Sequence, residues 1–324
     1  MKRFMFLTLG LFILTMAMYA LQSCTRIPSE NDNVKLSAEI LREYTNVPHD
    51  EIFHDPILTD ELKLRYKEYL RQLKNEIDAT GAKFVVTYIT PEIGNSITSA
   101  QKIGRDCIKR TCKELGIEFR DFSTAISALG SGATQAPRDI YWSKKGAAAV
   151  ARQLKKVIDD YSNYAVYNTY RTIDTIWGSL PPNMDSVLDG GKGVHYRLVS
   201  NAQGFRMDYD LASNKQKQRV LLLGDSAMFF PFLDNQDTGS GLLQAIYPNK
   251  EIINAANWGY SVDDHLDLYK KAKYADPDIV IMQTSSADIS DLYFTNRNIF
   301  SRKGPKHWPS EAEVRFYNEI LAQR

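Results

Sequence analysis

The stretch RVLLLGDSAMFF, from Arg219 to Phe230, decides the fold of this chain. Its apolar residues are continuous rather than alternating, which is typical of a strand covered on both faces of a parallel sheet. Gly224 allows a tight exit at the carboxyl edge of the sheet, where open α/β sheets bind ligands. Ser226 is therefore a candidate nucleophile, provided that a base reaches its hydroxyl. Asp225 and Ser226 are also good helix-capping residues, so a plain turn before a helix is the alternative.

Predicted strands and helices alternate on both sides of this stretch, which indicates a parallel α/β architecture. The predicted strands lie in the runs 83–91, 117–122, 219–226, 250–259 and 277–286. The predicted helices span residues 60–80, 96–115, 143–161, 239–248 and 261–275. Thr59 or Asp60 is the expected cap of the first helix, and Ser143 and Ser261 are the expected caps of two others.

The two halves of the chain each predict an incomplete sheet, with two strands before the connection 162–217 and three after it. We expect both halves to form one five-stranded sheet in a single three-layer, flavodoxin-like α/β domain. Two unrelated incomplete domains are the alternative. Within the connection, HYRLVSNAQGFRMDYDL (195–211) predicts additional edge strands.

The N-terminus has the order of a signal peptide: the positive MKR, an apolar run from Phe4 to Leu21, and LQSC ending at Cys24. LQSC resembles a bacterial lipobox, so Cys24 is the predicted lipidation site. An uncleaved membrane anchor and a free secreted protein are the alternatives. All three predict an extracytoplasmic location, in the periplasm or cell envelope. The predicted organisation is a signal peptide over 1–24, a tether over 25–57 and an α/β domain over 58–324, divided into 58–161, 162–217 and 218–324.

The charge balance excludes one class of partner. The 324 residues include 40 Lys plus Arg and 39 Asp plus Glu, and no basic stripe carries interleaved aromatic residues. We therefore expect no nucleic-acid partner. No spacing of Cys and His predicts a metal site, no motif predicts a cofactor, and Cys107 and Cys112 read as structural thiols.

Two further segments give the GDS turn a context. Gly259 follows the next predicted strand in NAANWGYS, and RDIYWSKKGAAAVARQL precedes Ser226 rather than following it. This order resembles that of the circularly permuted SGNH (GDSL-type) hydrolase-like domains of the alginate O-acetylation proteins AlgX and AlgJ and their DHHW-type relatives, over roughly 58–292. The residues that match the D-x-H-W segment of that group and the helix after it are Asp139, Trp142, Ser143 and Gly146.

The resemblance implies a reaction and a set of roles. Ser226 would attack an acyl ester, and the backbone N–H groups of Ser226 and Gly259 would hold the oxyanion. Asp139 would organise the base, and a membrane acetyl-export protein would be a partner. The asparagine that the family has after its third strand would fall in QTSSADISD, where this chain has Ser285, Ser286 and Asp288. Ser286 is the candidate substrate-binding residue of that segment.

Tyr141 stands where the family has its catalytic histidine, although tyrosine titrates near pH 10 and is a poor neutral base. Three interpretations are open. Tyr141 orients the substrate while another base, His195 or His265, serves Ser226. Alternatively, Asp139 acts on Ser226 directly, or the site has lost its chemistry and kept a binding groove.

The sequence thus supports two functions of different classes. The first is an acyl-ester enzyme, an O-acetyltransferase or acetylesterase, acting on an extracytoplasmic polysaccharide with Ser226 as nucleophile. The second is a non-catalytic glycan-binding or scaffold protein of a polysaccharide modification or export complex. Trp142 and Trp258 flank the predicted site and are candidate sugar-binding faces, with burial in the core as the alternative.

Overall fold

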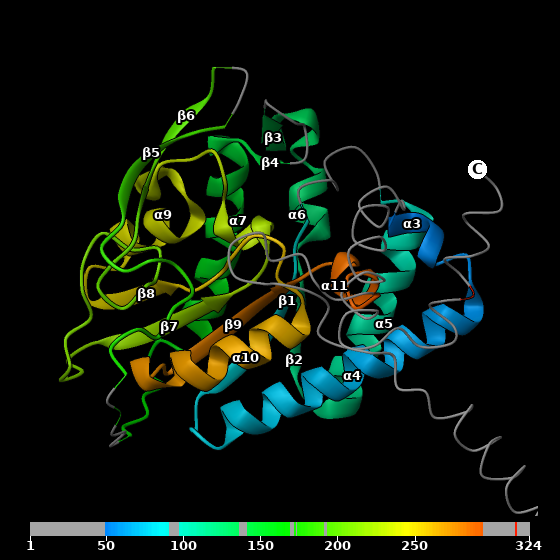
Figure 1. Cartoon of the computed structure of the whole chain (residues 1–324), viewed down its shortest axis with the longest axis horizontal. Coiled ribbons are helices and arrows are strands. Elements are labelled where there is room, and N and C mark those ends of the chain that lie inside the picture. The colour runs from blue at the N-terminus through cyan, green and yellow to red at the C-terminus, as the bar shows by residue number, and fades with distance from the viewer. Residues whose placement is uncertain are drawn as a thin grey trace, which may run out of the picture. The chain divides into compact units, whose positions relative to one another are not determined.

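The computed structural model describes residues 49–90, 97–135, 141–168, 172, 174–190, 193–293 and 315. A five-stranded sheet with the order β2-β1-β9-β7-β8 forms the centre of the domain (Figure 1). All of its strand pairs are parallel. The strands are β1 (Lys83–Tyr88), β2 (Glu118–Asp121), β7 (Gln218–Leu223), β8 (Lys250–Asn254) and β9 (Ile279–Thr284).

The strand order confirms that the two halves of the chain share one sheet. β9 pairs with β1 on one side and with β7 on the other, so Ile281 lies between Val85 and Leu222. Counted from β7, the sheet reads 2-1-3-4-5, which is the flavodoxin-like order. The chain therefore has a flavodoxin-like sheet whose last two strands come first in the sequence, and the alternative of two separate incomplete domains is wrong.

Helices cover both faces of the sheet, which explains the uninterrupted apolar strands. α4 (Pro56–Asp78) and α10 (Val262–Ala272) cross in front of it in Figure 1, and α7 (Lys144–Asp160) lies behind it. The remaining helices are α3 (His49–Ile52), α5 (Ser99–Leu115), α6 (Ser123–Ser127), α8 (Ser226–Phe229), α9 (Gly239–Ile246) and α11 (Ala287–Ser290). Short 3₁₀ turns span Gly130–Ala133, Asn235–Asp237 and Lys273–Ala275.

Side-chain caps fix where the long helices begin. The Oγ of Ser143 accepts the N–H of Gly146 at 3.0 Å, and Ser261 forms a capping box, as predicted for both helices. α4 begins before the predicted Thr59, because Asp55 caps it by accepting the N–H of Leu58 and is followed directly by a proline. α3 also lies within the segment 25–57 that was predicted to be a tether.

The connection between the halves has its own small sheet. β5 (Asp185–Asp189) and β6 (His195–Val199) form an antiparallel hairpin that pairs with no strand of the main sheet. The prediction of edge strands in 195–211 is therefore wrong. Alternate residues of β6 are buried, and the hairpin packs against the segment after α8, where the Asn235 side chain donates to the carbonyl oxygen of Val199. β3 (Thr134–Gln135) and β4 (Tyr141–Trp142) form a second two-stranded sheet.

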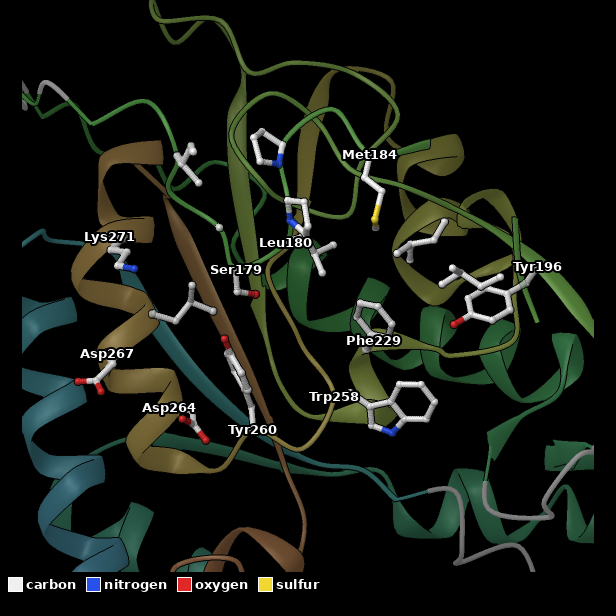
Figure 2. Close-up of a pocket in the computed structure, with 17 residues that line it drawn as sticks. Ser179, Leu180, Met184, Tyr196, Phe229, Trp258, Tyr260, Asp264, Asp267 and Lys271 are labelled. Atoms are coloured by element: carbon white, nitrogen blue, oxygen red, sulfur yellow. The ribbon is translucent and has the colours of Figure 1, made fainter. Parts of the chain in front are cut away.

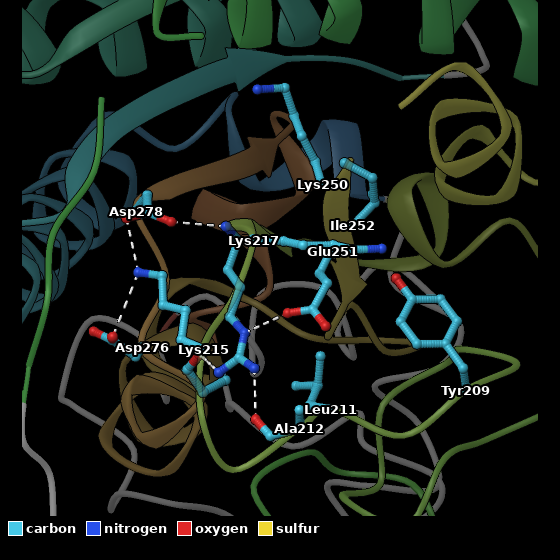
Figure 3. Close-up of polar contacts among 12 residues, drawn as sticks. Tyr209, Leu211, Ala212, Lys215, Lys217, Lys250, Glu251, Ile252, Asp276 and Asp278 are labelled. Carbon is cyan, nitrogen blue, oxygen red and sulfur yellow. Dashed lines mark hydrogen bonds and ion pairs between the residues drawn. The ribbon is translucent and has the colours of Figure 1, made fainter. Parts of the chain in front are cut away.

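Buried charges hold this connection to the amino end of the sheet (Figure 3). Arg219 forms a 2.6 Å ion pair with Glu251 and also donates to the carbonyl oxygen of Ala212. Lys215 lies 2.7 Å from Asp278, whose second carboxylate oxygen accepts the N–H of Arg219. Each charge has an opposite partner, so ion pairing offsets the cost of burying these groups. They stabilise the fold at this end of the sheet.

The structure bears on the predicted membrane anchor and on the two internal cysteines. No helix within the described ranges is long and apolar enough to cross a membrane. The predicted signal peptide and Cys24 lie outside those ranges. Cys107 and Cys112 are buried free thiols, and burial raises the pKa of the Cys112 thiol to about 12.

Candidate active site

Ser226 begins α8 at the carboxyl edge of the sheet, directly after the turn that ends β7. The strand order reverses between β7 and β9, and the crevice at such a switch point is where open α/β sheets bind ligands. The turn needs glycine, because a Cβ on Gly224 would lie 2.5 Å from Cβ of Met228 and 2.6 Å from Oε1 of Gln283. The Gln283 side chain also accepts the N–H of Asp225 at 2.9 Å, which fixes the turn on the neighbouring strand.

A buried arginine supports the far end of α8. Arg206 is 3% exposed and donates to the carbonyl oxygens of Phe229, Phe230 and Leu233. Phe230 and Phe232 have φ values of 55° and 65°, a conformation that non-glycine residues rarely adopt. Burial lowers the pKa of the Arg206 guanidinium to about 10, so it stays charged at neutral pH. Arg206 therefore holds a strained loop directly behind Ser226.

The segment predicted to complete the site lies against α8. The indole Nε1 of Trp142, in β4, donates to the carbonyl oxygen of Ala227 at 2.7 Å. Trp142 is fully buried, so its ring packs in the core and presents no face to a ligand. This placement corrects the sugar-binding role predicted for it. Asp139 lies outside the described residues.

Tyr141 belongs to an aromatic cluster beside this contact. Its ring packs edgewise on Phe232 and on Trp258, with centroid distances of 4.7 and 5.6 Å. Tyr196 of the β5–β6 hairpin packs on Phe232 at 5.6 Å. We call Tyr141, Tyr196, Phe232 and Trp258 the aromatic cluster. The cluster brings together the predicted residues Tyr141 and Trp258. Trp258 is half-buried, whereas Trp142 is fully buried.

The loop after β8 is tied to the Ser226 turn. The N–H of Asn257 donates to the carbonyl oxygen of Gly224 at 3.0 Å, and the Asn257 side chain donates to Oγ of Ser179 at 3.1 Å. Gly259 has a φ of 71°, which a glycine adopts without strain. The structure thus places the loop that carries Gly259 next to the turn that carries Ser226.

The loop after β9 is partly buried. Asp288 is 1% exposed, and its carboxylate accepts the N–H of Ser285 at 2.7 Å. Burial raises the pKa of Asp288 well above its usual range, and the negative charge of Asp225 raises it further. Ser286, a predicted substrate-binding residue, is half-buried and lies close to Gly104 of α5, where an added Cβ would be 2.5 Å from the Ser286 Cβ.

Of the two histidines proposed as substitute bases, one is buried and the other is exposed. His265 is completely buried in α10, and its Nε2 lies 3.7 Å from a carboxylate oxygen of Asp288. His195 is exposed at the start of β6, paired in register with Asp189. Within the described ranges, no group of three or more His, Cys, Asp or Glu side chains could hold a metal ion.

A cavity of about 650 Å³ opens beside this site (Figure 2). The segment before β5, the β5–β6 hairpin and α10 form its walls, and Phe229, Trp258 and Tyr260 line it next to the Ser226 and Gly259 loops. Sequence reasoning missed this cavity, because the weak pattern of 162–217 does not show where the hairpin folds back. The only sequence signal is the apolar spacing of Leu180, Met184 and Leu188 in that connection.

No protein-family model and no curated protein matches the chain. It is similar to several solved structures, of which three are described. The O-acetyltransferase domain of Pseudomonas putida AlgJ is 11% identical, with a TM-score of 0.48 over 82% of this chain and 93% of that one. Pseudomonas aeruginosa AlgX is 18% identical, with a TM-score of 0.37 over 69% and 57%. Bacillus cereus PatB1 is 11% identical, with a TM-score of 0.39 over 75% and 93%.

Proposed function

We propose that this protein is an SGNH-type acyl-ester enzyme that acts on an extracytoplasmic polysaccharide. One observation carries the proposal: Ser226 starts a helix at the switch point of a flavodoxin-like sheet, and the Tyr141–Trp142 segment contacts that helix. A strand, a glycine turn and a serine at such an edge form the part of the fold where a serine nucleophile is most accessible to a ligand.

The reaction proceeds through an acyl-enzyme. The Ser226 hydroxyl oxygen attacks the ester carbonyl, and the backbone N–H groups of Ser226 and Gly259 stabilise the oxyanion. The base takes the Ser226 proton and gives it to the leaving sugar oxygen as the tetrahedral intermediate collapses, which leaves the acyl group on Ser226. A second sugar hydroxyl then takes the acyl group in transfer, or water takes it in hydrolysis. Which acceptor enters depends on how well water is excluded.

The group that accepts the proton of Ser226 differs from the histidine of a Ser-His-Asp triad. Asp139 precedes Tyr141 by two positions and organises the base or acts on Ser226 itself. Tyr141 lies in the aromatic cluster and orients the substrate. The burial of His265 disfavours it as the base, since a base must reach both the serine hydroxyl and the leaving group. We therefore expect slow turnover.

The cell-envelope location and the partner belong to the same proposal. The signal-peptide pattern and the LQSC sequence at Cys24 support export and lipid anchoring. An O-acetyltransferase outside the cytoplasm needs acyl groups delivered across the membrane, so a membrane acetyl-export protein is the proposed partner. Radiolabelled palmitate incorporation that persists in Cys24→Ala would contradict lipidation at this residue.

Hydrolysis of p-nitrophenyl acetate tests the catalytic role of Ser226. We expect the wild-type protein to cleave this ester faster than Ser226→Ala. Ser162→Ala serves as the control, because Ser162 is exposed outside the site. A wild-type rate equal to that of Ser226→Ala would reject Ser226 as a nucleophile.

The aromatic cluster favours a second function, glycan binding without catalysis. Aromatic faces stack on the C–H groups of sugar rings, Tyr141 and Trp258 are half-buried, and Tyr141 takes the position of the histidine in the family that the sequence resembles. Calorimetric titration with O-acetylated oligosaccharides separates the two functions. Binding that weakens in Trp258→Ala, together with an esterase rate unchanged by Ser226→Ala, would favour the non-catalytic function.

A further inference from the structure

The cavity beside Ser226 has two chemically different ends (Figure 2). Asp264, Asp267 and Lys271 line one end from α10. Aliphatic side chains line the other end, and they come from the segment before β5 and from the β5–β6 hairpin; Leu180, Met184, Leu188 and Leu198 belong to this group. Hydrocarbon, rather than sugar hydroxyls, is the ligand that such an aliphatic wall favours.

The aliphatic end is also the end nearer to the proposed nucleophile. Phe229 lines the cavity and lies one helical turn after Ser226 on α8. Trp258 lines it too, directly before Gly259, and packs on Tyr141. A group that is esterified at Ser226 therefore lies next to the hydrocarbon wall, and the charged end of the cavity lies along α10.

The size of the cavity exceeds what an acetyl group needs. Its volume of about 650 Å³ lies within the range of pockets that enclose drug-sized ligands, about 300–1,000 Å³. An acetyl group would place a single methyl against this wall and leave most of the hydrocarbon surface without a partner. A longer chain would remove that surface from water.

We propose that this cavity is an acyl-chain site, and that the acyl group handled at Ser226 is a linear chain of medium length rather than acetyl. The assignment rests on the proposed acyl-ester function and replaces acetyl in it by a longer acyl group, which the proposed membrane partner would then have to deliver. The ester carbonyl sits at Ser226, and the alkyl chain extends past Phe229 between the hairpin and α10.

A chain-length series of p-nitrophenyl esters, from acetate to octanoate, tests the assignment. Each buried methylene raises affinity by about threefold to fourfold, so we expect kcat/KM for octanoate to exceed that for acetate by at least about tenfold. Leu188→Trp fills the cavity from β5 and should lower the octanoate-to-acetate ratio by about tenfold. Val187→Trp is the matched control, because Val187 is 72% exposed on the opposite face of the same strand. Met184→Trp is a second filling variant if Leu188→Trp does not fold.

A binding measurement tests the acyl-chain site independently of catalysis at Ser226. Calorimetric titration of Ser226→Ala with methyl octanoate should show binding that Leu188→Trp removes and Val187→Trp keeps. If no ester is cleaved but this binding pattern holds, the catalytic proposal fails and the acyl-chain site stands. If acetate is cleaved at Ser226 at least as well as octanoate and methyl octanoate does not bind, the acyl-chain site is overturned and the catalysis stands. Binding of methyl β-glucoside that Leu188→Trp abolishes would also overturn it, in favour of a sugar site.

Discussion

The indole Nε1–H of Trp142 donates a 2.7 Å hydrogen bond to the carbonyl oxygen of Ala227, the residue that follows Ser226. The two residues come from different halves of the chain, and Trp142 is completely buried. This bond therefore holds the segment that carries Tyr141 against the helix that begins with Ser226. The geometry of the proposed site depends on a core contact rather than on loop–loop contacts at the surface.

Trp142→Phe should weaken this connection while keeping most of the apolar packing. The carbonyl of Ala227 would lose its buried donor, so we expect the free energy of unfolding to fall by about 1–3 kcal/mol. Urea denaturation measures this loss. Trp177→Phe is the matched control, because the Trp177 indole donates to the carbonyl oxygen of Asp174 at the exposed surface, where water can replace it. Equal losses in both variants would contradict a special role for the Trp142 contact.

Arg206→Lys should destabilise the protein further and lower any Ser226-dependent activity. A lysine cannot reach the carbonyl oxygens that Arg206 binds around the strained Phe230–Leu233 loop, so buried acceptors would lose their partners. We expect a loss of about 3 kcal/mol or more in urea denaturation. Arg197→Lys changes an exposed ion pair with Asp185 and should stay within about 0.5 kcal/mol of wild type. A mild Arg206→Lys variant would show that the loop does not need the guanidinium.

The sequence predicted the sheet well because its strands are continuous apolar runs, each followed by a turn or a capped helix. RVLLL became β7 and DIVIMQT became β9, and both are buried along their length. The β5–β6 hairpin was not predicted as a separate sheet. Its residues alternate between exposed and buried like those of any edge strand, and only long-range packing decides which surface they cover.

The site was predictable in its parts but not in its surroundings. Local chemistry identified Gly224, Ser226 and Ser143, since a tight turn and a helix cap each depend on neighbouring residues. The burial of His265 could not be predicted, because DDHLDLYKK is polar in sequence and the packing of α10 against α4 buries several of its polar side chains. Arg206 was missed for the same reason: its acceptors lie about two dozen residues further along the chain.

Asp288→Asn should reveal a stability cost that grows with pH. Burial and the charge of Asp225 raise the pKa of Asp288, so the folded protein keeps this proton when the unfolded chain, with a carboxyl pKa of about 3.9, has lost it. Stability from this group is complete below pH ~3.9 and is lost as the pH rises toward the folded pKa. We expect the stability of Asp288→Asn relative to wild type to increase from about pH 4 to pH 8 in urea denaturation. His265 and Asp291 are ionisable groups near this carboxyl. If the stability difference between Asp288→Asn and wild type does not vary with pH, the titration of these two groups compensates that of Asp288.

Tyr141→His should increase esterase activity, because position 141 lies beside α8 and imidazole accepts a proton near neutral pH whereas a phenol does not. We expect kcat/KM for p-nitrophenyl acetate to rise at least about tenfold, with a new inflection near pH ~6.5. Tyr141→Phe removes the phenol without adding a base and should show neither change. The gain should disappear in Tyr141→His combined with Ser226→Ala, since the imidazole would then have no hydroxyl to activate. A gain that persists in the double variant would mean that the histidine acts on water or substrate directly, and the pairing of residue 141 with Ser226 would be wrong.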